Sequence, residues 1–115
     1  MRIGDIEYPS LKGRVSEAEW STRVELAAIY RLIAIYGWFD LAKPGVSAKI
    51  PGEPYYLFNP AELLFEEITA SSLVKVTIDG EIVGEGPFDY VPGSWFPSQA
   101  VHAVRPDANW VFHSH

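Results

Sequence analysis

The sequence predicts an α/β fold in which helices cover a mainly antiparallel sheet. Three observations carry the prediction: a long helical segment with start and stop signals, two pairs of strand-like segments joined by turns, and a final apolar run at residues 110–113. The predicted order is helix, hairpin, short helix, hairpin, helix, strand. Mixed orders of this kind form layered α/β domains.

The first helix is marked at both ends. Ser16 and Glu19 have the spacing of a capping box, in which each side chain satisfies a backbone amide at the helix start. Gly37 suits the left-handed C-terminal cap that would end the helix after Tyr36. The helix carries two apolar stripes, one formed by Leu26, Ile29, Tyr30 and Ile33 and the other by Trp20, Val24, Ala27 and Ala28. So wide an apolar arc predicts cover on two sides.

The rest of the chain alternates strands with short helices. Residues 46–50 and 55–58 flank a turn at 51–54, and residues 74–78 and 81–83 flank Asp79-Gly80, which favours a tight hairpin. Residues 61–67 and 94–104 are predicted helices, and Pro97 would be tolerated in the first turn of the second. Residues 1–15 are predicted as an extended lead-in to a domain over residues 16–115.

Charge and composition exclude several classes of protein. Nine basic and fifteen acidic residues give a formal net charge of −6, which disfavours nucleic acid and anionic membrane surfaces as partners. The chain has no cysteine, so it has neither disulfides nor thiolate chemistry. The longest apolar stretch, residues 26–39, is too short to span a bilayer. We therefore expect a cytoplasmic protein that binds neither nucleic acid nor membranes.

His113 and His115 form the candidate metal site. On a strand, residues at i and i+2 point to the same face, and two imidazoles so placed can share a Zn²⁺ ion. A His-x-His pair can equally be a solvated segment without a site. The spacing alone leaves both interpretations open.

The surrounding segments resemble the class II aldolase and adducin family, in particular its adducin-like branch. The family's first two metal histidines lie in a segment similar to RPDANWVFHSH. A second family segment is similar to LFNPAELLFEEITASSLVKVTIDG, and the family's first helix, loop and hairpin resemble ELAAIYRLIAIYGWFDLAKPGVSAKIPGEP. The resemblance covers about Ser16 to His115 in the family's order.

The resemblance implies a three-layer α/β/α sandwich, incomplete at the C-terminus of this chain. It implies a homotetramer with active sites at subunit contacts, and Zn²⁺ or another divalent metal held by three histidines. His113 and His115 would be two of these, with the third beyond His115. Family enzymes act on small-molecule substrates by retro-aldol cleavage, epimerisation and related lyase reactions, in which the metal polarises a carbonyl. Adducin uses the fold without known catalysis.

The sequence departs from the family's phosphosugar site at three places. Pro44 and Gly45 stand where the family has a phosphate-binding Gly-Asn pair, and Ala61 and Glu62 stand where it has Thr-Gly. Ser94 stands at the position of the glutamate that serves as acid and base, and a serine alone cannot replace that carboxylate. We therefore expect a substrate without phosphate, and an inactive portion of a larger domain.

Two functions stay open at this point. One is a divalent-metal-dependent lyase-type enzyme acting on a small carbonyl or hydroxy-acid substrate, and the other is a non-catalytic adducin-like binding or scaffold module. The remaining polar candidates have simpler interpretations: His102 as a packing residue, and Glu66, Glu67, Lys43 and Lys49 as surface residues.

Overall fold

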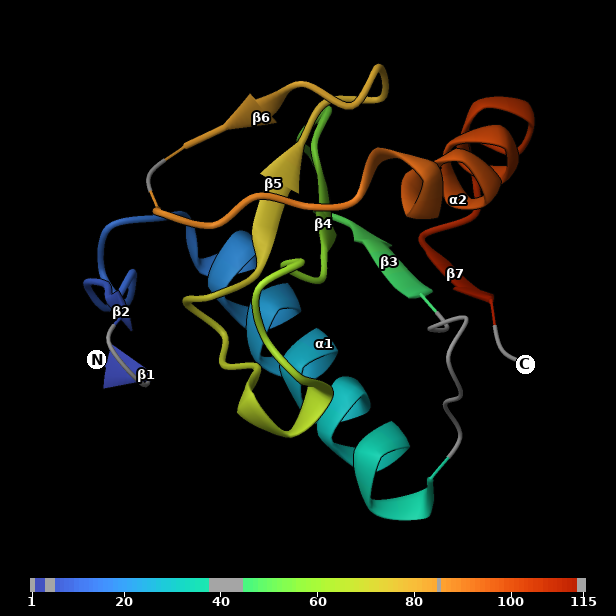
Figure 1. Cartoon of the computed structure of the whole chain (residues 1–115). Coiled ribbons are helices and arrows are strands. Elements are labelled where there is room, and N and C mark those ends of the chain that lie inside the picture. Colours follow the sequence, from blue (N-terminus) through green and yellow to red (C-terminus); the bar gives the residue numbers. More distant parts are fainter. Residues whose placement is uncertain (1, 4–5, 38–44, 85, 114–115) are drawn as a thin grey trace.

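The structure is a computed structural model that describes residues 2–3, 6–37, 45–84 and 86–113 (Figure 1). The elements in chain order are β1 (Arg2–Ile3), β2 (Ile6–Glu7), α1 (Glu17–Tyr36), β3 (Gly45–Lys49), β4 (Tyr56–Phe58), the 3₁₀ helix η1 (Phe65–Glu67), β5 (Val74–Val76), β6 (Ile82–Val83), α2 (Pro92–Val104) and β7 (Trp110–His113).

The main sheet has five strands in the order β6-β5-β4-β3-β7, and every neighbouring pair is antiparallel. The two predicted hairpins are β3–β4 and β5–β6. The last strand, β7, does not pair with its sequence neighbour but returns to β3. Strands β1 and β2 form a separate two-stranded ribbon within the predicted lead-in, a pairing that the sequence did not indicate.

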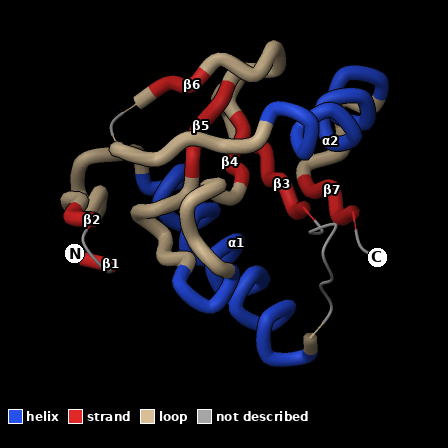
Figure 2. Tube along the Cα trace, viewed as in Figure 1, coloured by secondary structure: helices blue, strands red, loops and turns tan. Residues whose placement is uncertain are grey.

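The two helices cover opposite faces of the sheet, as the three-layer prediction requires. Ser47 Oγ lies 2.8 Å from His102 Nε2 of α2, and the rings of Tyr56 and Phe58 pack on Trp95 of the same helix. Because side chains alternate along a strand, the intervening residues of β3 and β4 point to the other face, where α1 lies (Figures 1 and 2). The α/β fold with a mainly antiparallel sheet is confirmed.

Helix α1 has the predicted bounds, but only half of its capping box forms. Ser16 Oγ accepts a hydrogen bond from Glu19 N at 3.1 Å, and Gly37 ends the helix in the left-handed conformation at φ 68°. The Glu19 carboxylate instead bonds Arg23 and Lys75. The stripe that reaches the core consists of Leu26, Ala27, Tyr30 and Ile33.

Three predicted elements differ in extent by two or more residues. Helix α2 begins at Pro92 rather than Ser94, because Pro92 is suited to the first helical position. Pro97 consequently lies inside the helix and not in its first turn. Residues 61–67 form a turn followed only by the 3₁₀ helix η1, and β5 stops at Val76 before a longer turn.

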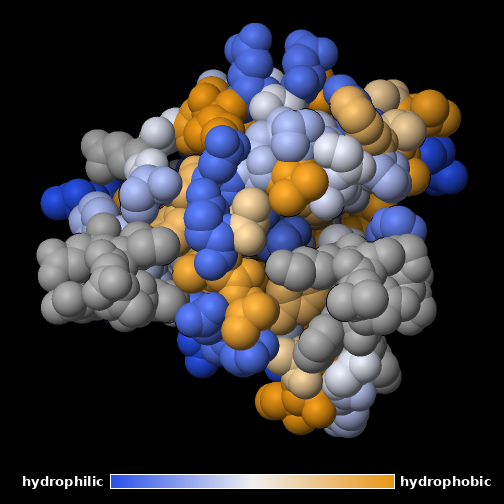
Figure 3. All heavy atoms as spheres, in the orientation of Figure 1, coloured by the Kyte–Doolittle hydropathy of each residue, from blue (hydrophilic) through white to orange (hydrophobic). Residues whose placement is uncertain are grey.

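Several large apolar side chains stay exposed. On α1, Leu32 and Ile35 are 50% and 75% exposed. Others lie on α2, where Phe96, Val101 and Val104 are exposed, and on β7, where Trp110 and Phe112 are partly exposed. Apolar groups on one face of the molecule are orange in Figure 3. Part of the predicted second stripe, Val24 and Ala28, is also exposed. No helix within the described ranges is long and apolar enough to cross a membrane.

Candidate functional site

The pairing of β7 with β3 places His113. Its Cα partner across the two strands is Gly45, and Ser47 is paired with Val111 in the same register. Directly paired residues share a face of the sheet, so His113 lies on the α2 face, and it is exposed there. The structure therefore brings together one predicted metal ligand, His113, and one predicted substrate position, Gly45. The other residue of each predicted pair, His115 and Pro44, lies outside the described residues.

Gly45 is required by the close approach of an aromatic ring. A Cβ atom at this position would lie 2.9 Å from two ring carbons of Phe58, which is closer than carbon atoms pack. An asparagine-like side chain therefore cannot occupy position 45 unless Phe58 moves. The ring fills the space from which a phosphate-binding side chain would project.

Ala61 and Glu62 are held by the loop that leads into α2. Ala61 N donates to Asp89 O at 2.9 Å, and the Glu62 carboxylate accepts from Asp89 N at 3.0 Å. Both residues are exposed. The backbone amide of Ala61 is thus already used, and the charge of Glu62 would repel an anion placed there.

Ser94 lies exposed in the first turn of α2, where its backbone amide donates to Val91 O. The other carboxylates considered from the sequence take ordinary roles. Glu67 Oε1 accepts from Leu64 N at 2.9 Å, and Glu66 is exposed. Neither of them is joined to Ser94 or Gly45 by a recorded contact among the described residues.

His102 is a packing residue, as predicted, but it is fully buried and bridges three elements. Its Nδ1 lies 3.1 Å from Ala108 O. A carbonyl only accepts hydrogen bonds, so Nδ1 carries the proton and Nε2 accepts from the Ser47 hydroxyl. Burial lowers the pKa of His102, although the bond to Ala108 acts in the opposite direction. The neutral ring links α2, β3 and the turn before β7.

The described residues do not by themselves fit a metal ion. Within them, no three His, Asp or Glu side chains lie close enough together to hold one. A protein zinc site needs three or four ligands, and of the two predicted ligands only His113 lies in the described part of the chain. A complete site would need His115 and at least one further ligand from outside the described part of the chain.

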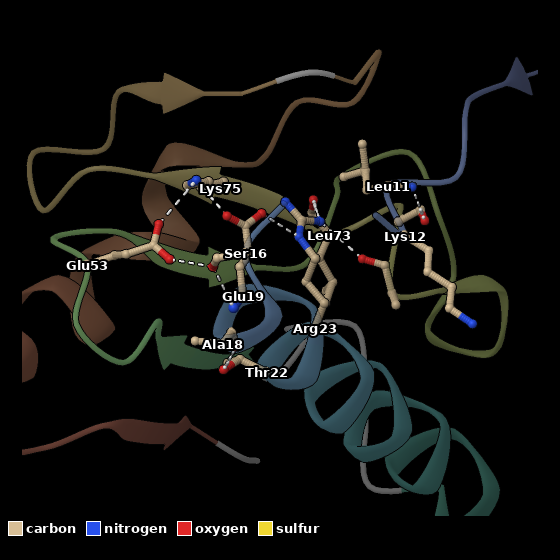
Figure 4. A network of polar contacts seen from close by, with 12 residues as sticks. Leu11, Lys12, Ser16, Ala18, Glu19, Thr22, Arg23, Glu53, Leu73 and Lys75 are labelled. Carbon is tan, nitrogen blue, oxygen red and sulfur yellow. Dashed lines mark hydrogen bonds and ion pairs between the residues drawn. The ribbon is translucent and has the colours of Figure 1, made fainter. Parts of the chain in front are cut away.

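The sequence analysis did not anticipate a cluster of four charged side chains away from these positions. Glu19, Arg23, Lys75 and Glu53 meet in a cleft beside the start of α1 (Figure 4). Two signals could have indicated it. Glu19 and Arg23 have the i, i+4 spacing of a helical ion pair, and Lys75 lies between Val74 and Val76 in an apolar strand.

Comparison with known proteins places the chain in a family. The family model described as "Class II Aldolase and Adducin N-terminal domain" matches residues 24–115. A Caulobacter vibrioides protein named as an aldolase class 2 protein is 49% identical over 116 residues, which are 100% of this chain and 45% of that protein. Mouse gamma-adducin is 40% identical over 102 residues, 86% of this chain and 14% of that protein.

Solved structures show the same relationship. An aldolase II superfamily protein from Pseudomonas syringae has a TM-score of 0.85 at 44% identity, covering 93% of this chain and 44% of that one. The L-fuculose 1-phosphate aldolase of Glaciozyma antarctica PI12 shares the fold, with a TM-score of 0.77 at 22% identity, covering 97% and 45%. The chain spans less than half the length of these relatives. On the strength of the family match over residues 24–115, the chain belongs to the class II aldolase and adducin N-terminal domain family.

Proposed function

We propose that this chain supplies His113 and His115 as two ligands of a divalent metal, zinc or a related ion, in a lyase-type enzyme acting on a small carbonyl or hydroxy-acid substrate. The observation that carries the proposal is the pairing of His113 with Gly45, which sets a metal-position histidine beside a family substrate position. When bound, such a metal would act as a Lewis acid on a substrate carbonyl.

The proposed substrate carries no phosphate. Phe58 occupies the space beside Gly45, the Ala61 amide is bonded to Asp89, and Glu62 adds a negative charge. A phosphate brought to these positions would meet an aromatic ring, a backbone amide that already donates a hydrogen bond, and a negatively charged carboxylate. Both departures at the phosphate-binding positions, Gly45 and the pair Ala61 and Glu62, therefore disfavour a phosphorylated substrate.

Two further parts of the proposal rest on family membership: the third metal ligand comes from outside the described residues, and the protein assembles as a homo-oligomer such as a tetramer. A cytoplasmic location is proposed from the composition, which includes no cysteine. The exposed apolar residues of α1 and β7 support association, because exposed strand edges and apolar patches favour contact with another chain. The 115 residues alone are proposed to bind metal weakly and to be inactive.

Calorimetric titration with Zn²⁺ tests the metal proposal. We expect weak binding to the chain, reduced by about tenfold or more in His113→Ala and in His115→Ala, since even residues that only orient metal ligands contribute about tenfold or more. Asn109→Ala, an exposed neighbour of β7, is the matched control and should bind as the unmodified chain does. Tight one-to-one binding that survives His115→Ala would refute the assignment.

The second candidate function is an adducin-like binding or scaffold module. Two observations favour it: Ser94 provides no acid or base, and the similarity to gamma-adducin covers 86% of this chain. Because the 115 residues alone are proposed to be inactive, the two candidates are separated by assaying a longer protein that contains the whole domain, with Zn²⁺ present, on unphosphorylated and phosphorylated hydroxy acids and aldols. Turnover of the unphosphorylated set that is lost in His113→Ala supports the lyase. The absence of both turnover and metal binding in that longer protein supports the binding module.

A further inference from the structure

Strand β7 is an edge strand of the main sheet, and its pairing with β3 fixes the direction of its backbone groups (Figure 1). Lys49 N donates to Asn109 O at 2.7 Å. Bonded and non-bonded residue pairs alternate along an antiparallel ladder, so Val111 is the next residue of β7 that bonds β3. Trp110 and Phe112 occupy the alternate positions. Their N–H and C=O groups therefore point away from β3, to the free edge of the sheet.

A contact on the other side of β3 supports this assignment. Phe112 is paired with Val46, and the Tyr30 hydroxyl accepts from Val46 N at 2.9 Å and lies 2.6 Å from Val46 O. Val46 thus turns its backbone groups away from β7, as a non-bonded pair requires. In the part of the chain that the structure describes, no hydrogen bond reaches the backbone groups of Trp110 or Phe112. Both residues leave an N–H donor and a C=O acceptor for water or for another strand.

The same two residues carry exposed aromatic side chains beside the free edge. Trp110 is 39% exposed and Phe112 is 48% exposed. Because they stand at i and i+2, both side chains lie on one face of the sheet, the face opposite to that of His113. Unpaired backbone groups next to exposed apolar side chains favour the addition of another strand.

This edge also lacks the features that keep strand edges apart. Residues 109–113, NWVFH, contain no proline, no lysine and no carboxylate. The opposite edge strand of the sheet, β6, is two residues long and follows Glu81, and short length and charge both discourage strand addition. The whole chain has a formal charge of −6, so two copies repel each other least where neither brings a charge. These properties favour β7 as the contact between copies.

We propose that β7 binds β7 of a second copy of this chain in an antiparallel pair centred on Val111. Trp110 of each copy then lies opposite Phe112 of the other copy, and each of these pairs exchanges two backbone hydrogen bonds. All the free-edge groups are used, and the rings form cross-strand aromatic pairs on one face. Registers centred on Trp110 or on Phe112 would use only one of the two residues, so the central register is the self-complementary one.

The inference specifies the association proposed above and requires neither a metal nor catalysis. The exposed parts of the Trp110 and Phe112 side chains supply roughly 150–200 Å² of apolar area per copy. A standard interface buries about 800 Å² on each partner. The dimer is therefore weak and forms in proportion to protein concentration.

Two double variants at the same positions test the contact by analytical ultracentrifugation of the 115-residue chain without divalent metal. The like-charged variant combines Trp110→Lys with Phe112→Lys, which sets lysines opposite each other and should weaken the dimer by about tenfold or more. The opposite-charged variant combines Trp110→Lys with Phe112→Glu, which sets lysine opposite glutamate and should dimerise about tenfold more tightly than the like-charged variant. Non-specific repulsion predicts the reverse order, because only the like-charged variant reduces the net charge of −6.

A control variant and a direct measurement complete the test. Phe96→Lys, at a position 61% exposed on α2, is the matched control and should leave the dimer unchanged. Backbone amide exchange of the unmodified chain reports the register. Protection of the Trp110 and Phe112 amides should rise with protein concentration, whereas the Val111 amide, which bonds β3, should be protected at every concentration.

The proposal is overturned if the unmodified chain stays monomeric up to its solubility limit, or if the two charge variants dimerise equally. Protection of the Trp110 and Phe112 amides in the monomer would also overturn it, because another segment of the same chain would then occupy the edge. A dimer weakened by Phe96→Lys but not by the like-charged variant would keep the association and exclude β7 as its site. Circular dichroism first establishes that the variants are folded, and amide exchange decides the question if they are not. The Zn²⁺ titration tests the metal proposal separately.

Discussion

Replacing Tyr30 with phenylalanine removes one oxygen from the junction between α1 and the sheet, and we expect it to lower the free energy of unfolding by about 2–3 kcal/mol. The recorded pairing of β4 with β3 stops at Ala48↔Leu57. Continued by two residues, the same register would set Val46 opposite Asn59, where Asn59-Pro60 ends the strand. The Tyr30 hydroxyl lies at this point: it accepts from Val46 N at 2.9 Å and lies 2.6 Å from Val46 O and 3.0 Å from Asn59 Oδ1.

The magnitude follows from these contacts. The hydroxyl has one proton, so at any moment it accepts one bond and donates one. Two bonds at about 1 kcal/mol each account for about 2 kcal/mol, and a buried backbone group left without a partner adds to the loss. Tyr30 is fully buried, so water does not readily replace the missing oxygen.

Urea denaturation followed by tryptophan fluorescence measures the effect. Tyr36→Phe, at a position 64% exposed on the same helix, is the control and should change the free energy of unfolding by no more than about 0.5 kcal/mol. If Tyr30→Phe lowers the free energy of unfolding by no more than the Tyr36→Phe control does, the view that this hydroxyl replaces a missing sheet partner is refuted.

A pH series provides a second check. Burial raises the pKa of the Tyr30 phenol above its ordinary value of 10.0. As pH rises through 10, the unfolded chain ionises while the folded one does not. The stability that the phenol contributes is therefore complete below pH 10 and declines above it. The difference between the unmodified protein and Tyr30→Phe should narrow in that range, and a constant difference would contradict the assignment.

Three other substitutions test the packing and the polar contacts. Gly45→Ala should lower the free energy of unfolding by about 1–3 kcal/mol through overpacking against Phe58. Combining Gly45→Ala with Phe58→Leu should recover part of the lost free energy of unfolding. If the effects of the two substitutions on the free energy of unfolding are simply additive, a Cβ at position 45 does not press on the Phe58 ring. Burial lowers the pKa of His102 below 6.5, so its contribution to stability is complete above pH 6.5 and is lost as pH falls. The free energy of unfolding of His102→Gln, measured in urea, should therefore fall less on acidification than that of the unmodified protein. Equal dependence of the two free energies on pH would contradict this. Glu19→Gln leaves Arg23 and Lys75 without their shared carboxylate and should cost about 3–5 kcal/mol. A double-mutant cycle of Glu19→Gln and Arg23→Met should show strong coupling in the free energy of unfolding. If the two substitutions act independently, Glu19 and Arg23 do not form a stabilising buried ion pair.

Much of the fold could be predicted because its signals are local. Ser16 and Gly37 mark α1 within one residue at each end, and the turn at 51–54 and Asp79-Gly80 identify both hairpins. Each signal acts through backbone geometry within a few residues. Where two local signals competed, as for Pro92 and Pro97 in α2, the predicted boundary was wrong by two residues.

The candidate site was predictable only in part. The resemblance indicated His113, Gly45, Ala61, Glu62 and Ser94, but it could not indicate what occupies the space beside them. The Phe58 ring against Gly45 and the Asp89 bonds of Ala61 and Glu62 join residues 13 or more positions apart in the sequence. No periodicity or motif reports such contacts. The face that carries His113 likewise depends on the register of β7 with β3.

Local backbone preferences and motifs read in order are enough to predict the fold class, the capped first helix, the two hairpins and the family. Three features required the folded chain: β7 pairs with β3, His102 is buried as a bridge, and the Glu19 carboxylate bonds Arg23 and Lys75 instead of completing the capping box. Burial explains the last two. Once chain packing removes a polar group from water, its partner is chosen by whichever donor or acceptor the fold brings near, however distant that group is along the chain.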